Sequence, residues 1–116
     1  MVENFSIESH FSGKEPIVRA MYDRLLVSLR KFGRIIEEPK KTSIHLVNVS
    51  ALAGVETRKA YILLNIKADH KINSPRIDKV EQVSAKRFHH RMKLSNLSDI
   101  DNELLSWLHD AYVLSG

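Results

Sequence analysis

The stretch at residues 42–67, TSIHLVNVSALAGVETRKAYILLNIK, decides the fold, because hydrophobic residues alternate along both of its ends. In its second part every other residue is apolar, and this apolar face consists of Ala60, Ile62, Leu64 and Ile66. Residues 44–49 repeat the alternation less regularly, with apolar residues on both faces. A period of two is typical of β-strands. Gly54 stands between the two segments, where glycine favours chain reversal, so the stretch predicts an antiparallel hairpin with Gly54 in its loop.

One domain, residues 1–116, accounts for the whole chain, of which 43% is hydrophobic. A chain of this size can bury roughly two thirds of the surface of its unfolded state. The absence of cysteine excludes disulfides and thiolate chemistry. The chain start lacks a signal-peptide pattern, and no apolar run approaches the roughly 18 residues of a membrane span. We therefore expect a soluble cytoplasmic protein with no membrane segment.

An amphipathic helix is predicted to begin near Pro16, because apolar residues recur there every three or four positions. This apolar stripe consists of Ile17, Ala20, Met21, Leu25, Leu29 and Phe32. Ser12 and Glu15 have the spacing of a capping box, and Gly33 is placed to end the helix in a left-handed conformation.

A second amphipathic helix is predicted near the end of the chain. Its apolar stripe consists of Ile100, Leu104, Trp107, Leu108 and Ala111. Ser98 stands three residues before Asp101 and is the predicted N-cap. Asp99, Asp101 and Glu103 then fall near the first turn, where carboxylates complement the helix macrodipole. We interpret them as capping groups rather than as an acidic site.

Residues 87–94 predict another strand, since apolar and cationic positions alternate. Its apolar side consists of Phe88, His90, Met92 and Leu94. Residues 77–83 are compatible with a strand or a helical turn, and we favour the strand, whereas residues 34–38 are expected to form a short extended lead into the hairpin. This order of elements predicts a two-layer α+β domain: an antiparallel meander sheet of three to four strands, with the N-terminal and C-terminal helices packed on one face.

Several segments occur in a distinctive order between His10 and Tyr112. They are HFSGKEP, KTSIHL, the LAGV turn, KAYILLNI, KRFHHRMKL and DIDNELLSWLHDAY. In this order the chain resembles the domain-of-unknown-function family 5655. The resemblance implies a small α+β domain, found alone or attached to larger proteins that are sometimes labelled predicted transport proteins. It implies no established activity and no catalytic residues.

No catalytic or cofactor motif is present, since the chain lacks a nucleophile elbow, a phosphate loop and a His-Glu-x-x-His pattern. We expect no cofactor. The six histidines are scattered, and the adjacent His89 and His90 would point to opposite sides of a strand, so we expect no metal site. His90 falls among apolar residues, which predicts a buried, neutral imidazole with a hydrogen-bond partner. An enzyme with a dispersed site remains the alternative to a non-enzymatic domain.

A cationic face opposite the apolar side of these strands is the best functional lead. Its candidate residues are Lys59, Tyr61, Lys67, Arg87, His89, Arg91 and Lys93. Positive charge beside an aromatic ring suits phosphate contacts and stacking on a base, and the net charge of the chain is +4. We therefore predict a binding domain for an anionic ligand or nucleic acid, although a plain solvated sheet face would look the same.

A protein partner is the other version of this prediction. The same face would be apolar at its centre if Tyr61 and Leu63 lay beside Val47 and Val49. Such a surface is suited to a homodimer or to a partner domain.

Overall fold

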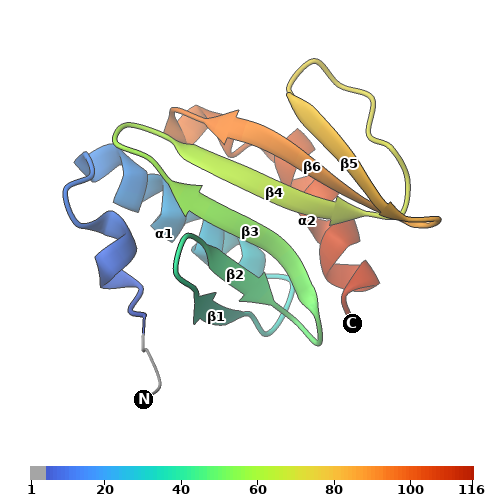
Figure 1. Cartoon of the computed structure of the whole chain (residues 1–116), viewed down its shortest axis with the longest axis horizontal. Coiled ribbons are helices and arrows are strands. Elements are labelled where there is room, and N and C mark those ends of the chain that lie inside the picture. Colours follow the sequence, from blue (N-terminus) through green and yellow to red (C-terminus); the bar gives the residue numbers. More distant parts are fainter. Residues whose placement is uncertain (1–4) are drawn as a thin grey trace.

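The computed structural model describes residues 5–116, which form one sheet and two helices in two layers (Figure 1). The helices are α1 (Pro16–Arg30) and α2 (Asn102–Leu114), with short 3₁₀ turns η1 (Glu8–Phe11) and η2 (Leu97–Asp99). The strands are β1 (Ile36–Pro39), β2 (Ile44–Val47), β3 (Ala51–Thr57), β4 (Ile62–Ala68), β5 (Lys79–Ser84) and β6 (Arg87–Leu94). They lie in the order β1-β2-β3-β4-β6-β5, and every neighbouring pair is antiparallel. Both helices lie behind the sheet in Figure 1, so the face toward the viewer is uncovered.

Residues 42–67 contain three strands rather than the two that were predicted. Gly54 lies in the middle of β3, where it pairs with His45 of β2 on one side and Asn65 of β4 on the other. The prediction that Gly54 forms the hairpin loop is therefore wrong.

The pattern of β3 explains this error. Leu52 and Ala53 are consecutive and both buried, because the register between β2 and β3 shifts at a bulge between Leu46 and Val47. A bulge breaks the alternation that identifies a strand. Glycine in a strand interior weakens the same signal, so β3 resembles a loop in sequence.

The sheet has six strands instead of the predicted three to four, while the α+β class and the antiparallel pairing are confirmed. One addition is β3, and another is β1, where Ile36–Pro39, overlapping the expected extended lead at residues 34–38, pairs with β2 as an edge strand. The predicted strand at residues 77–83 is confirmed as β5, which forms the other edge.

The ends of α1 differ from the predicted capping. The helix begins at Pro16 with Glu15 as its N-cap, and no side chain caps it, so the expected capping box of Ser12 and Glu15 does not form. Gly33 follows the helix with φ of +153°, which is positive but not the predicted left-handed helical value. This positive φ favours glycine, and a Cβ at Gly33 would also lie against the Tyr112 hydroxyl of α2.

The start of α2 is shifted from the predicted N-cap at Ser98. Asp101 caps the helix, and its Oδ1 accepts a hydrogen bond of 3.0 Å from the backbone N–H of Leu104. Ser98 lies within η2, which is capped by a box formed between Asn96 and Asp99. The sequence offers two capping groups in close succession, and the chain uses each for a separate turn.

The core lies between the helices and the covered face of the sheet. The sheet contributes Ile44, Leu46, Val55, Ile62, Leu64, Ile66, Met92 and Leu94, all essentially inaccessible to solvent. The helices contribute Val18, Met21, Tyr22, Leu25, Leu26, Leu29, Leu104, Leu108 and Ala111. The apolar alternation of β4 thus faces the helices, as predicted.

His90 is fully buried on this covered face, as its position predicted. Its Nε2 accepts a hydrogen bond of 2.9 Å from the backbone N–H of Ile72, which identifies the uncharged ring. Its Nδ1 has no hydrogen-bond partner within residues 5–116. Burial lowers the pKa of His90, and a weaker contribution from the Ile66 carbonyl acts in the opposite direction.

Leu64→Ala tests the assignment of the two faces. We expect it to lower the free energy of unfolding by about 2 to 5 kcal/mol, because it removes buried methyl groups and leaves a cavity. Leu63→Ala, the same change on the uncovered face, is the matched control and should cost clearly less. Chemical denaturation measures both, and equal losses would contradict the assignment.

Stability should also depend on His90. Because its folded pKa is depressed, the full stability is present above the unfolded pKa of about 6.5. It should be lost as pH falls through that value and level off below the folded pKa, since only the unfolded state gains a proton in this window. Denaturation midpoints between about pH 8 and pH 5 measure the loss. His90→Asn, which keeps an acceptor but does not titrate, should remove this component, and an NMR titration giving His90 a raised pKa would refute it.

Candidate functional site

A hollow of about 410 Å³ lies on the uncovered face of the sheet. We call it the Gly54 hollow, and its lining includes His45, Gly54, Asn65, Lys67, His89 and Arg91. These residues come from four neighbouring strands, β2, β3, β4 and β6. It is therefore a feature of the sheet surface and not of a loop.

Strand register brings these residues together. His45 pairs with Gly54, Gly54 with Asn65, Asn65 with Arg91, and Arg91 with Lys79. Residues paired directly across antiparallel strands carry their side chains on the same face. One row of polar side chains, interrupted only by Gly54, therefore crosses five strands.

Three of the seven predicted site residues line the Gly54 hollow, namely Lys67, His89 and Arg91. Two others, Tyr61 and Lys93, contact each other, with Lys93 Nζ 4.3 Å from the centre of the Tyr61 ring. This cation–π pair lies toward one end of the face, and in it the Tyr61 ring already stabilises the ammonium group of Lys93.

The remaining two candidates are placed differently. Arg87 begins β6 opposite Ser84, and its charge acts on Lys67 across the sheet. Lys59 lies in the turn between β3 and β4, where its carbonyl oxygen accepts a hydrogen bond of 2.8 Å from the N–H of Glu15. Strand alternation does not extend to Lys59, so the structure does not bring it to the hollow.

Sequence reasoning missed His45, Gly54 and Asn65 as lining residues. Alternation does assign Asn65 to the same face as Lys67, but its side chain has neither the positive charge nor the aromatic ring by which the candidates were selected. Gly54 was missed because it was assigned to a loop.

The guanidinium of Arg91 is held in one orientation by Asp78. Its Nε donates a hydrogen bond of 3.0 Å to Asp78 Oδ1, and the backbone N–H of Asp78 donates one of 2.9 Å to the Arg91 carbonyl oxygen. The two Nη nitrogens make no hydrogen bond within the described part of the chain. They remain available for an external acceptor, and an arginine fork suits a carboxylate or phosphate.

Lys67 carries a positive charge that no carboxylate in the described part of the chain neutralises. Its Nζ donates a hydrogen bond of 3.0 Å to Ser50 Oγ, and it forms no ion pair with a carboxylate among residues 5–116. Partial burial and the charge of Arg87 lower the pKa of Lys67. A bound anion would favour the charged form and raise this pKa.

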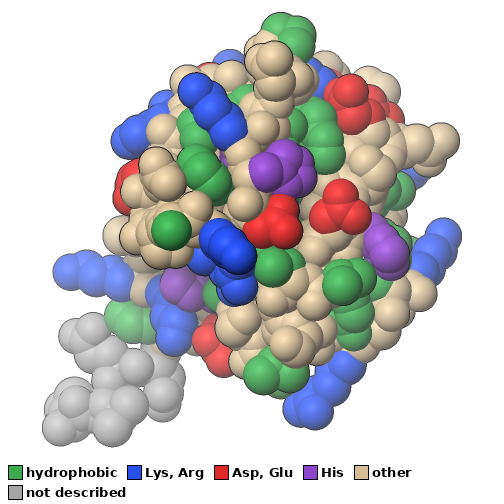
Figure 2. All heavy atoms as spheres, turned by 90° about the vertical axis from the view of Figure 1, so that its right-hand side faces the viewer, with side chains coloured by type: hydrophobic (Ala, Val, Ile, Leu, Met, Phe, Trp, Pro, Cys, Tyr) green, Lys and Arg blue, Asp and Glu red, His purple; other side chains and the backbone are tan. Residues whose placement is uncertain are grey.

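The face is less uniformly cationic than predicted, because Glu56 and Glu81 also line the Gly54 hollow. Figure 2 shows one end of the molecule, where Lys and Arg side chains are interspersed with carboxylates, histidines and apolar groups. At this end there is no continuous field of one charge.

The predicted apolar centre of the face is also wrong. Val47 is buried, and Val49 lies in the turn after β2 with 79% of its surface exposed. Tyr61 and Leu63 are only half-buried and lie toward one end. The centre is occupied by Gly54 and its polar neighbours because the extra strand β3 separates β2 from β4.

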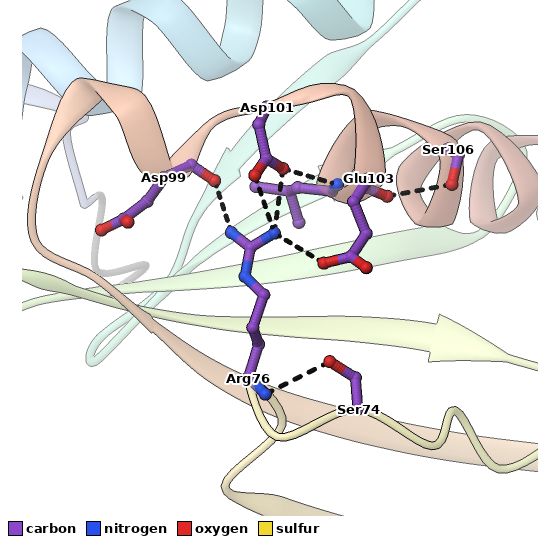
Figure 3. A network of polar contacts seen from close by, with 7 residues as sticks. Ser74, Arg76, Asp99, Asp101, Glu103 and Ser106 are labelled. Atoms are coloured by element: carbon purple, nitrogen blue, oxygen red, sulfur yellow. Dashed lines mark hydrogen bonds and ion pairs between the residues drawn. The ribbon is translucent and has the colours of Figure 1, made fainter.

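The carboxylates near the start of α2 bind an arginine of the same chain (Figure 3). Arg76 Nη1 donates hydrogen bonds of 2.9 Å to Asp101 and Glu103, and Nη2 donates one of 2.7 Å to the Asp99 carbonyl oxygen. The guanidinium also lies 5.7 Å from the centre of the Trp107 ring. This cluster ties the loop before β5 to the start of α2. The predicted structural role of the carboxylates is supported, although sequence reasoning did not identify Arg76.

None of the helices in the part of the chain that the structure describes is long and apolar enough to cross a membrane. Within the same residues, no group of three or more His, Asp or Glu side chains is arranged to hold a metal ion.

Fold and surface together define a two-layer α+β domain, with a six-stranded antiparallel sheet covered by helices on one face and hollowed on the other. The chain belongs to the family described as Domain of unknown function (DUF5655), whose model matches residues 7–115. This match covers nearly the whole chain and confirms the resemblance of the sequence segments. No curated protein and no solved structure matches the chain.

Arg76→Ala tests the structural role of the cluster. We expect a loss of roughly 1 kcal/mol in the free energy of unfolding, because Arg76 loses several hydrogen bonds at once while its partners Asp101 and Glu103 are about half exposed to solvent. Arg76→Lys should recover little, since one ammonium group cannot reproduce the forked contacts. Arg24→Ala, an exposed change on α1, is the control. Equal midpoints for Arg76→Ala and Arg24→Ala in urea denaturation would contradict the role.

Proposed function

We propose that this domain binds a small anionic ligand in the Gly54 hollow. The observation that carries the proposal is that Lys67, His89 and Arg91 line one hollow of about 410 Å³. Small-molecule sites commonly have volumes of roughly 300 to 1,000 Å³. Positively charged side chains and a hollow of suitable size thus lie together on the face of the sheet that the helices leave uncovered.

The two cations support an anion specifically. The two Nη nitrogens of Arg91 make no hydrogen bond within residues 5–116, and Lys67 lies beside Arg87 without a carboxylate partner among the same residues. An anion between Lys67 and Arg91 would relieve the repulsion between neighbouring positive charges and satisfy free donors.

Mixed charge favours a compact ligand over a nucleic acid. Glu56 and Glu81 line the same hollow, and Asp78 neutralises part of Arg91. A nucleic-acid backbone spreads phosphates along its length and would meet these carboxylates. Nucleic acid is the second candidate, favoured by the cation–π pair of the half-buried Tyr61 with the exposed Lys93.

Titration of the ¹⁵N-labelled protein with inorganic phosphate, and with small carboxylates and phosphate esters, tests the proposal. We expect resonance shifts along β4 and β6, and binding weakened at least about tenfold by Lys67→Ala or Arg91→Ala, since each removes a charge-assisted contact. Arg24→Ala should bind as wild type does.

An absence of shifts with every small anion would refute the proposal. Salt-sensitive binding to unrelated DNA and RNA sequences alike, with a logarithmic salt slope that Arg91→Ala makes shallower by about one, would favour the second candidate.

A further inference from the structure

Gly54 is a glycine that the fold does not require. Its φ is not positive, unlike those of Gly13 and Gly33. A Cβ at Gly54 would lie 3.9 Å from Asn65 Cβ and 3.9 Å from His45 Cδ2, which are ordinary van der Waals distances. Neither backbone conformation nor crowding therefore excludes a side chain. Glycine in a strand interior nevertheless costs stability relative to alanine.

The missing side chain opens the centre of the uncovered face. His45 and Asn65 stand on the strands either side of Gly54, so their backbones lie roughly 10 Å apart, or two strand spacings. Between them the surface consists of bare β3 backbone. A glycine inside a strand often marks the close approach of a ligand, and a flat group can lie against such a floor.

The side chains beside this floor offer unused polar groups. The side chains of His45 and Asn65 are half-buried and make no hydrogen bond with another residue within the described range. The Asn65 amide presents donors and an acceptor together, and the imidazole of His45 presents one of each when neutral. Paired donors and acceptors suit the edge of a heterocyclic ring.

The cations are near the same floor. Arg91 pairs directly with Asn65, roughly 5 Å away, and Lys67 lies two residues further along β4, roughly 7 Å from Asn65. Only a few bonds can therefore separate the flat part of a ligand from its anionic group.

We infer that the ligand is a heterocycle bearing a phosphate or carboxylate, of the size of a nucleoside monophosphate. Its ring lies on Gly54 between His45 and Asn65, and its anionic group reaches Arg91 and Lys67. The inference rests on the anion site proposed above and names the class of ligand that this site takes.

Four probes separate the two halves of such a ligand. AMP has a ring and a phosphate, nicotinate has a ring and a carboxylate, ribose 5-phosphate has no ring, and adenosine has no charge. By calorimetry or NMR we expect AMP or nicotinate to bind at least about tenfold more tightly than both ribose 5-phosphate and adenosine. The comparison of AMP with nicotinate identifies the anionic group.

Gly54→Val supplies the second test, because a β-branched residue suits a strand and fills the hollow. We expect it to weaken binding of the ring-bearing anion at least about tenfold, while ribose 5-phosphate binding stays within about twofold of wild type. The retained binding of ribose 5-phosphate would also show that the fold is intact. Gly54→Ala should bind less tightly than wild type while its melting temperature is unchanged or higher.

The outcomes are distinct. If ribose 5-phosphate binds as well as AMP and nicotinate, or if Gly54→Val leaves the ring-bearing anion unaffected, the inferred ligand class is wrong and the anion site stands. If wild type binds none of the anionic probes and no inorganic phosphate, the anion site itself falls.

Discussion

The apolar alternation of β4 is the constraint on which the rest of the structure depends. Its even-numbered residues are buried against the two helices. A shift of one residue in the strand register would therefore expose Leu64 and bury Lys67. Because β3 and β6 pair with β4 in fixed register, this choice of face also determines which side chains of the neighbouring strands look outward. The polar row across the uncovered face follows from what the opposite face must bury.

This dependence explains how much could be predicted from the sequence. Period-two patterns in β4 and β6 predicted which of their residues share a face, and those assignments hold for Lys67, His89 and Arg91. The pattern failed at β3, where a bulge and a glycine hide the strand. It also could not reach Arg76, because no local pattern joins a loop residue to carboxylates more than twenty positions away.

The choice of residue type is much less constrained on the uncovered face than on the covered one. A buried position must be apolar, or hydrogen-bonded as His90 is to Ile72, so its residue type carries information about the fold. An outward position tolerates almost any polar residue, and only the side chains around it show whether it could contact a ligand. Asn65 is uninformative by itself and becomes a candidate contact only beside Gly54 and Arg91. The candidate contact is therefore defined by positions in three dimensions and not by residue type.

The strand order has a consequence for assembly. Apart from the junction of β4 with β6, every neighbouring pair in the sheet is also consecutive in the chain. The sheet thus consists of two blocks, a β1–β4 meander and a β5–β6 hairpin, which meet along a single seam. Asn65 belongs to the first block and Arg91 to the second, so the Gly54 hollow straddles that seam. Each block alone holds only part of the lining, and the complete surface exists only in chains whose two blocks have joined.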